Sequence, residues 1–237
     1  MNNTALSTET WRHEKKALLT DISHHELINL IKRHPYHFIE AYPERYVNNI
    51  YFDDERLSHY NANINGISYR TKLRLRWYGD AFGIIDPSLE LKIKSGYLGT
   101  KLHANTVSFK LSEDFSGDDV ERFLKLGTYS QQINEVLCRT EPRVMNRYLR
   151  QYFVSTDGLF RITVDSNVSF KRIFQLCGSQ TTNEMRDVLI LEFKYDQESE
   201  ERAHLITGHF PFRMTKSSKY VAGIQKTYPM FNNITDY

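Results

Sequence analysis

Alternation of polar and apolar residues along several short segments is the feature that most constrains the fold of this chain. In residues 69–78, Arg70, Lys72, Arg74 and Arg76 alternate with apolar and aromatic residues. Successive side chains of a β-strand point to opposite faces of a sheet, so these four cations share one face. Like charges at close range repel each other, and a solvated face would normally mix its signs. A purely cationic face therefore needs an explanation beyond exposure to water.

The same alternation recurs in residues 90–94, 161–165 and 190–194. One such strand is most often half-buried with a solvated face, but agreement among four strands favours a shared polar surface. An open groove could collect these faces, and so could a closed antiparallel β-barrel with a polar interior and covering helices. Helical patterns at residues 24–33 and 118–126 could provide the cover. We expect an α+β fold that is mainly antiparallel β.

Composition limits the class of protein. The 237 residues contain no internal repeat or Pro/Gly/Ser-rich linker, which predicts a flexible tail at 1–10 and a single domain at 11–237. Lys and Arg number 31 against 29 Asp and Glu, so the cationic strand reflects local sorting of charge and argues against nucleic-acid binding. Two cysteines, no apolar run of membrane-spanning length and no signal-peptide pattern predict a cytoplasmic protein.

A cationic interior predicts a polyanionic ligand. Arg and Lys suit phosphate chains, because each guanidinium can bind two phosphate oxygens. Polyphosphate chemistry also uses a divalent cation, Mg²⁺ or Mn²⁺, held by carboxylate and phosphate oxygens. Acids should therefore lie among the cations, and the candidate metal ligands are Glu14, Glu90 and Glu192.

Eight segments together resemble those of one known family, the VTC catalytic domain, in the order found there. The segments are RHEKK (12–16), NNIYFDD (48–54), YRTKLRLRWY (69–78), LELKIK (89–94), RYLRQYF (147–153), FRITVD (160–165), LILEFKY (189–195) and KSSKY (216–220). This is the polyphosphate polymerase domain of the vacuolar transporter chaperone complex and its stand-alone bacterial relatives, in the CYTH or triphosphate tunnel metalloenzyme superfamily. The resemblance covers about residues 11–228. It implies a closed, tunnel-like β-barrel that transfers the γ-phosphate of ATP to inorganic polyphosphate with a divalent metal, typically Mn²⁺.

The resemblance also implies roles for individual residues. The phosphate-binding residues would be Lys16, Arg74, Arg76, Lys92, Arg150, Arg161, Lys216 and Lys219, with Glu192 on the metal. Within that set, the residues that would hold the triphosphate for catalysis are Arg74, Arg76, Lys92, Arg150 and Arg161. The further substrate-binding candidates are Arg70, Lys72, Lys94 and Lys101. For Arg161 the alternative is an ion pair with Asp165, two positions along the same face.

The chain departs from the hydrolytic members of that superfamily at one position. Their signature is Glu-x-Glu-x-Lys, whereas here Arg12 precedes Glu14 and Lys16. Because one metal-side carboxylate is missing, we favour the polymerase. An inorganic or nucleoside triphosphatase, with water as the nucleophile, and a non-catalytic polyphosphate-binding module stay open. Coupling to transport across a membrane would need separately encoded partners.

Overall fold

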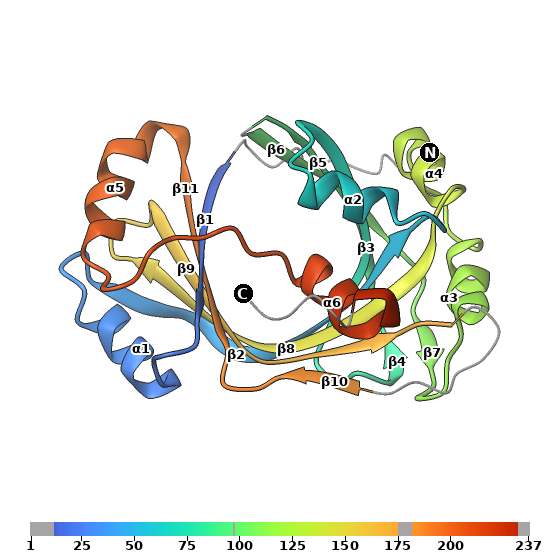
Figure 1. Ribbon diagram of the computed structural model, residues 1–237, viewed down its shortest axis with the longest axis horizontal. Helices are drawn as coiled ribbons and strands as arrows, with labels where there is room; N and C mark the ends of the chain where they lie inside the picture. Colours follow the sequence, from blue (N-terminus) through green and yellow to red (C-terminus); the bar gives the residue numbers. More distant parts are fainter. Residues whose placement is uncertain (1–11, 97, 175–181, 232–237) are drawn as a thin grey trace.

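The computed structural model describes residues 12–96, 98–174 and 182–231 (Figure 1). The predicted tail at residues 1–10 lies outside them. Within these residues the main element is a nine-stranded antiparallel sheet of order β1-β11-β9-β8-β2-β3-β5-β6, in which β10 also pairs with β9. Its strands are β1 (Arg12–Leu19), β2 (Phe38–Asp53), β3 (Tyr69–Tyr78), β5 (Ser88–Ser95), β6 (Leu98–Asn105), β8 (Glu141–Ser155), β9 (Phe160–Arg172), β10 (Thr182–Met185) and β11 (Leu189–Asp196). A separate two-stranded sheet pairs β4 (Gly83–Ile85) with β7 (Phe109–Leu111).

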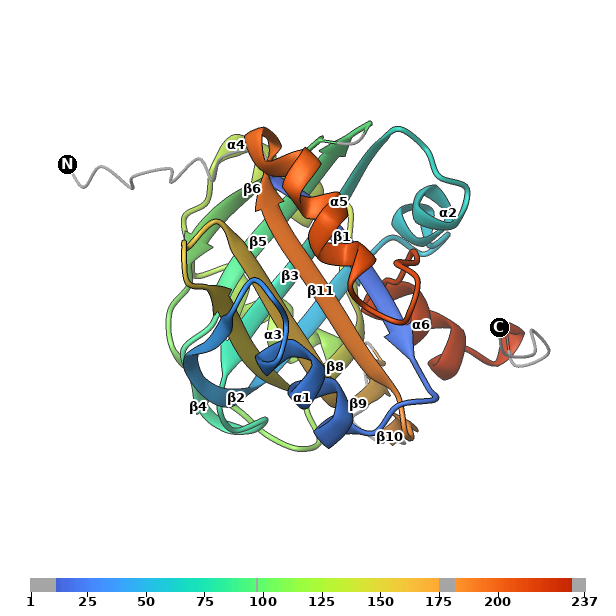
Figure 2. The ribbon, with the colours of Figure 1, turned by 90° about the vertical axis from the view of Figure 1, so that its left-hand side faces the viewer.

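Helices lie on both faces of the main sheet. They are α1 (His24–Lys32), α2 (Ser58–Ile64), α3 (Gly117–Leu124), α4 (Gln131–Leu137), α5 (Glu200–Gly208) and α6 (Lys219–Thr227), with short 3-10 turns η1 (Gln197–Ser199) and η2 (Pro229–Phe231). Figures 1 and 2 show α1 and α5 on the outer side of β11 and β9, and Figure 1 shows α3 and α4 outside β3. In the part of the chain that is described, no helix is long and apolar enough to cross a membrane.

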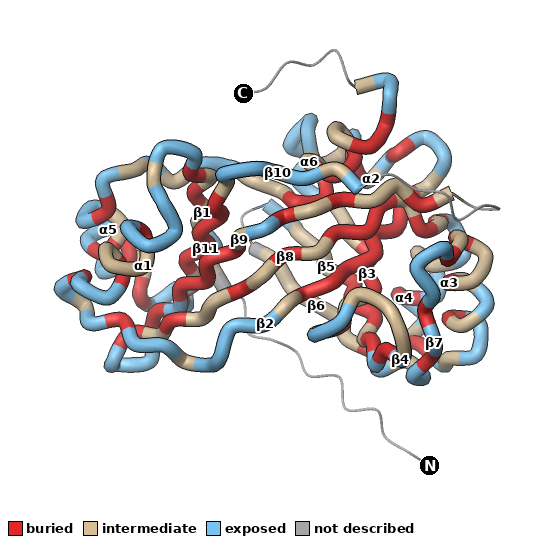
Figure 3. Tube along the Cα trace, turned by 90° about the horizontal axis from the view of Figure 1, so that it is seen from below, coloured by how far each residue is buried: buried red, intermediate tan, exposed pale blue. Residues whose placement is uncertain are grey.

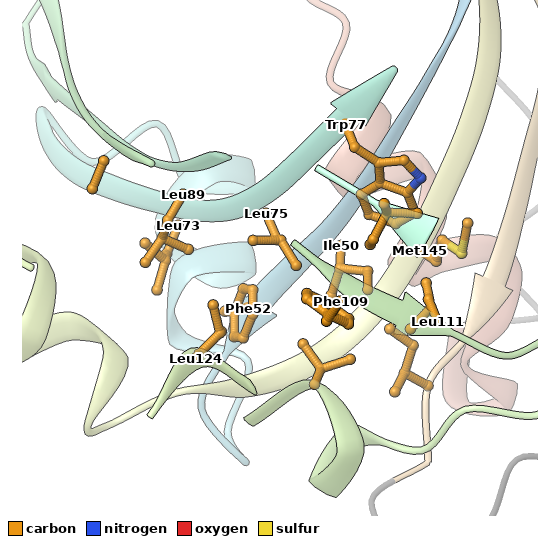
Figure 4. Packing of buried hydrophobic residues seen from close by; sticks show 14 of the residues in the cluster. Ile50, Phe52, Leu73, Leu75, Trp77, Leu89, Phe109, Leu111, Leu124 and Met145 are labelled. Atoms are coloured by element: carbon orange, nitrogen blue, oxygen red, sulfur yellow. The ribbon is translucent and has the colours of Figure 1, made fainter. Parts of the chain in front are cut away.

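The predicted alternation explains how the outer face of the sheet is buried. On β3, Leu73, Leu75 and Trp77 are buried and pack against the covering elements, where Leu124 of α3 joins them (Figure 4). A second apolar cluster packs α1 and α5 against the other end of the sheet. Each large apolar side chain buried in this way contributes roughly 1.5–3 kcal/mol. Figure 3 shows buried positions along the strands and exposed ones in most connections.

The helix α6 lies on the opposite, inner face of the sheet. Its residues Tyr220 and Ile224 pack with Val144 of β8 and Phe170 of β9 in a third apolar cluster. Figure 1 shows α6 within the curve of the sheet, over β8. One end of the inner face is therefore covered by α6, while the rest carries the charged residues that the alternation predicts. We call this inner side the concave face.

The sheet curls until its two edge strands approach each other, but the closed barrel is not confirmed. β1 and β6 are close in space, yet no strand pairing joins them among the described residues. Instead, the free edge of β1 accepts a hydrogen bond from the N–H of Thr215, in the segment that links α5 to α6. The carbonyl of Lys16 that accepts this bond is therefore not free to pair with β6. The sheet is therefore strongly curved and open along this seam.

A bulge in β9 decides which of its residues face inward. Asn167 has a φ of +51°, and the pairing with β8 shifts by one residue between Arg147 and Leu149. Asparagine tolerates this left-handed conformation better than most residues. Because the bulge adds one residue, Asp165 before it and Phe170 after it both face the concave side, although their parities differ.

Candidate functional site

The charged residues of the concave face come from strands at both ends of the sheet. Lys16 of β1 lies opposite Glu192 of β11, and Arg74 of β3 lies opposite Glu90 of β5. Directly opposed residues share one face of a sheet. The curvature then brings the two groups together, since the charges of Glu14 and Lys194 act on the ammonium of Lys92 of β5.

Glu192 is the centre of the first group. Its carboxylate is 3.1 Å from Lys16 Nζ, 3.2 Å from Arg150 Nη2, 3.4 Å from Lys194 Nζ and 3.6 Å from Lys219 Nζ. Burial alone would raise the pKa of Glu192, but the surrounding cations outweigh burial and hold its pKa well below the usual range. Glu192 is therefore ionised, and it pairs with cations from β1, β8, β11 and α6.

Asp165 fixes the orientation of the Arg150 guanidinium through two hydrogen bonds. It is fully buried and accepts hydrogen bonds from Arg150 Nε at 2.5 Å and Nη2 at 2.6 Å, and it also pairs with Lys219. Burial would raise the pKa of Asp165, but Arg150 and Lys219 lower it. The fork of Arg150 is thus held in one orientation, with Glu192 on its other side.

A second group centres on Glu90. Arg74 donates from Nε to Glu90 at 2.6 Å, and Lys101 Nζ lies 3.3 Å from the other carboxylate oxygen. Both Arg74 and Glu90 are almost fully buried. Burial would raise the pKa of Glu90, yet Arg74, Arg76 and the neighbouring lysines hold it far below the usual range. Glu90 therefore serves to position Arg74, and its predicted role as a metal ligand stays a prediction.

Arg76 is oriented by neutral partners. It donates from Nε to Asn49 Oδ1 at 2.8 Å and from Nη2 to the hydroxyl of Tyr148 at 3.3 Å. Asn49 in turn donates to Asn146 Oδ1 at 2.8 Å. An asparagine pair buried within two strands is unusual, because Asn is depleted in strands. The residues Asn49, Asn146 and Tyr148 lie within or beside the quoted segments, but the sequence analysis assigned them no role.

Lys72 of β3 and Lys92 of β5 lie where the surroundings disfavour their charged forms. Burial lowers the pKa of Lys72 to about 7, helped by the charges of Lys16 and Arg74. The pKa of Lys92 is also lowered, first by Arg74 and then by burial. Lys72 Nζ donates to Ser218 Oγ at 3.0 Å, at the residue that caps α6. An anion bound beside Lys72 and Lys92 would favour the charged form of both lysines and so raise their pKa values.

The remaining predicted residues lie at the margins. Arg70 donates to the carbonyl of Ile67 at 2.8 Å and lies opposite Lys94, whose pKa is lowered by burial and by Arg70. Lys216 is exposed, and its charge also acts on Lys94.

Arg161 is exposed beside Lys194, at the end of β9 away from α6. The alternative partner considered for it, Asp165, is bound by Arg150 and Lys219 instead.

One known family accounts for nearly the whole chain. The VTC domain matches residues 11–228. This chain belongs to the VTC domain family. No curated protein matches it.

Solved structures with the same fold cover almost the full VTC domain described above. One is a putative adenylate cyclase from Vibrio parahaemolyticus, with 15% identity, 90% of this chain and 98% of that chain covered, and a TM-score of 0.50. Another, from Bacillus halodurans, has 12% identity, 94% and 100% coverage and a TM-score of 0.54. A third, from Hippeastrum, is described as having a dominant triphosphatase activity, with 12% identity, 94% and 99% coverage and a TM-score of 0.51. At these identities the likeness shows the fold alone.

Two carboxylates of this VTC domain converge on one point. Lys16 Nζ lies 3.2 Å from Glu14 and 3.1 Å from Glu192. Burial would raise the pKa of Glu14, but Lys16 and its neighbours lower it to about 2, so both acids are ionised. Among the described residues, no group of three or more His, Cys, Asp or Glu could hold a metal. One or two carboxylates completed by phosphate oxygens are nonetheless the ligand set that Mg²⁺ uses at phosphate sites, so Glu14 and Glu192 fit such an ion.

Proposed function

We propose that this VTC domain is a metal-dependent polyphosphate polymerase that transfers the γ-phosphate of ATP to a polyphosphate chain. The observation that carries the proposal is the excess of buried cationic charge on the concave face. The pKa of Lys72 is lowered by burial and by nearby cations, and that of Lys92 by Arg74 and by burial, although Glu14, Glu90, Asp165 and Glu192 are all ionised nearby. A bound phosphate chain would supply the missing negative charge.

The arginines would hold the reacting triphosphate. Phosphoryl transfer needs in-line geometry and stabilisation of charge on the equatorial oxygens, with little covalent work by the protein. Arg74, Arg76 and Arg150 are each held by a hydrogen-bond partner, so their forks are oriented before substrate binds. Lys92 would add charge, and Arg161 would act nearer the margin. The nucleophile would be a terminal oxygen of the acceptor phosphate.

The lysines on both sides of this centre would guide the acceptor and the product chain. Lys16 and Lys219 lie beside Glu192, and Lys216 lies farther out with Lys94. Glu192 and Glu14 would hold Mg²⁺ or Mn²⁺, which when bound neutralises charge on phosphate oxygens. Lys16, which contacts both carboxylates, would then turn to the phosphate chain. A tunnel is part of the same proposal, and the segment around Thr215, which bonds to the free edge of β1, would contribute to its wall between β1 and β6.

A triphosphatase is the second candidate, and the position of α6 favours it. A polymerase must let a growing chain leave the site, whereas a hydrolase needs a single opening. α6 packs on the concave face at one end, through contacts with Val144 and Phe170. For the polymerase, the chain would therefore have to leave at another point of the rim.

Purified protein with ATP and Mn²⁺ distinguishes these activities. Products are separated on a gel that resolves polyphosphate, and free phosphate is measured in parallel. The polymerase predicts long chains with little free phosphate, and the triphosphatase predicts free phosphate without chains. Binding of polyphosphate with neither product would leave a non-catalytic binding module.

Two variants show whether any activity belongs to the site described. Arg150→Ala should lose roughly 10²–10³-fold in turnover, by analogy with the loss of one oxyanion donor. Lys110→Ala removes an exposed cation of β7 and should retain full activity. Equal activity of the two variants would contradict the role proposed for Arg150.

A further inference from the structure

A cluster of aromatic residues lies on the concave face beside the phosphate site. Tyr78 follows Arg76 by two residues on β3, and Tyr152 follows Arg150 by two residues on β8. Arg45 of β2 lies directly opposite Arg150, and Tyr42 lies directly opposite Tyr152. Residues two apart on a strand share a face, and so do directly opposed residues. The cluster is therefore one step outward from two of the arginines proposed to hold the triphosphate.

Arg45 joins the tyrosines into one surface. Its guanidinium carbon is 3.9 Å from the ring centroid of Tyr78 and 5.2 Å from that of Tyr152, and its Nε donates to the Tyr152 hydroxyl at 3.1 Å. Tyr42 meets Tyr152 edge to face, with ring centroids 5.8 Å apart. These contacts fix the aromatic rings relative to each other, and the Arg45 guanidinium lies over one face of the Tyr78 ring.

Two of the three tyrosines remain largely exposed despite their apolar rings, and Tyr152 is half-buried. Tyr42 is 66% exposed and Tyr78 is 47% exposed, whereas Leu73, Leu75 and Trp77 on the outer face of β3 are buried. A chain of inorganic phosphate has no apolar part that would cover these rings. The base of a nucleotide does, because it stacks on aromatic rings and on arginine guanidinium planes.

We propose that Tyr42, Tyr78, Tyr152 and Arg45 form a stacking site for the base of a nucleoside triphosphate whose phosphates lie on Arg76 and Arg150. This inference rests on the proposed function, because it takes the adjacent arginines as the triphosphate site. The inference also places the nucleoside at the end of the concave face away from α6, so the nucleotide would enter from that end. Stacking depends little on which base is present. The site should therefore accept several nucleoside triphosphates with similar affinity.

Comparison of ATP with inorganic tripolyphosphate isolates the contribution of the base. Both ligands carry a triphosphate, and only ATP has a nucleoside. Affinities are measured by calorimetry without added divalent metal, on the wild-type protein and on the double variant Tyr42→Ala/Tyr78→Ala. The double variant should bind ATP about ten-fold more weakly, with its tripolyphosphate affinity within about two-fold of the wild-type value.

Two further variants serve as controls. Tyr69→Ala removes a tyrosine that is 63% exposed on the same strand but on the opposite face, and it should leave both affinities unchanged. Tyr78→Phe keeps an aromatic ring and should retain the wild-type ATP affinity, while Tyr78→Ala should not. Circular dichroism and a thermal melt of each variant show whether the fold is retained.

The outcomes separate this inference from the proposed function. An unchanged ATP affinity in the double variant overturns the stacking site, and so does an equal loss of affinity for ATP and tripolyphosphate. A wild-type protein that binds both ligands but forms neither polyphosphate nor free phosphate overturns the proposed enzyme. In that case the ratio of ATP affinity to tripolyphosphate affinity, compared between the wild type and the double variant, still shows whether the stacking site exists. This ratio does not depend on turnover.

Discussion

Buried carboxylates set the positions of the cations on the concave face, one residue at a time. Asp165 holds the fork of Arg150, Glu90 holds Arg74, and Glu192 gathers Lys16 and Lys219. Removing one partner of a buried pair leaves an uncompensated charge, which costs about 3–5 kcal/mol. The acids therefore make it possible to concentrate arginine and lysine in one place, and they leave the lysines of β3 and β5 as the least compensated charges.

Lys72 gives the site a pH dependence that can be measured. Its pKa in the free protein is about 7, below the ordinary value of 10.5, because burial and the nearby cations Lys16 and Arg74 disfavour its charge. A bound polyanion favours the charged form and raises the pKa. The contribution of Lys72 to affinity should therefore be complete below pH 7 and fall as the pH rises above 7, by at most about ten-fold per pH unit.

Calorimetric affinities for tripolyphosphate between pH 6 and pH 9 test this. The Lys72→Met variant should bind more weakly than the wild type at pH 6, and the difference should narrow at higher pH. Titration of the ligand itself affects both proteins equally, so it cancels in the ratio. A ratio that stays constant across this range would show that Lys72 does not titrate near pH 7.

At the scale of elements, α6 is the piece that the strand pattern does not explain. Its serine cap, Ser218, also accepts from Lys72, and Lys219 reaches Asp165 and Glu192. Its opposite side packs on β8 and β9 through Gly223 and Ile224. The helix α6 thus contacts both the charged centre and the apolar end of the concave face. Its close approach to β8 and β9 depends on Gly223, which has no side chain.

Substitution of that glycine should loosen α6. A Cβ atom at Gly223 would lie 2.8 Å from Phe170 Cδ1 and 3.1 Å from Val144 Cγ2, so the helix or the sheet must move. We expect Gly223→Ala to lower the free energy of unfolding by about 1–3 kcal/mol, as overpacking does elsewhere. Urea denaturation measures this change.

Gly208→Ala in α5 is the matched control. No heavy atom lies within 4 Å of a Cβ built there, so this change should be neutral or slightly stabilising. If the two variants unfold at the same urea concentration, α6 does not pack as closely as described. Tripolyphosphate binding by Gly223→Ala should also weaken, because Lys219 moves with the helix.

For the whole molecule, the distribution of charge matters more than its sum. The chain has a net charge of only +2, yet the curled sheet gathers cations from both of its ends into one buried surface. Such a surface is expected to lower the stability of the free protein, and binding of the proposed ligand would restore stability by mass action. A trade of stability for binding is common at functional sites.

Lys92 is the residue at which this exchange of stability for ligand binding should be measurable. Replacing it by Met removes a half-buried lysine whose pKa is already depressed by Arg74 and by burial. Lys92→Met should raise the melting temperature of the free protein by about 2–4 °C, which corresponds to about 1 kcal/mol at this chain length. It should also reduce the further rise produced by tripolyphosphate.

Differential scanning calorimetry with and without tripolyphosphate gives both quantities. Lys110→Met, at an exposed position of β7, should change neither of them. A lower melting temperature for free Lys92→Met would mean that Lys92 stabilises the fold, and the site would then hold no excess of positive charge at this position.

Local periodicity was enough to predict many of the elements. The alternation at residues 69–78 predicts β3 with its observed bounds, and the helical pattern at 24–33 predicts α1 to within one residue. The helices α2 and α5 lack such a signal, because α2 is short and α5 buries few residues, among them Ala203 and Ile206. The segment that forms α6 is also not predicted as a helix. The shared face of the cations within β3, and within β5, also follows directly from the pattern.

The sequence by itself determined the strand faces, the local excess of cations and, through its eight segments, membership of the VTC domain family. The tertiary structure decided which charges meet. Asp165 pairs with Arg150 and Lys219 because a bulge at Asn167 and the curl of the sheet set its direction, and among the described residues Thr215, not β6, bonds to the free edge of β1. The stacking cluster joins residues of β2, β3 and β8. Periodicity reports the face of a single strand, whereas contacts between strands depend on register and curvature, which arise only when the whole sheet has formed.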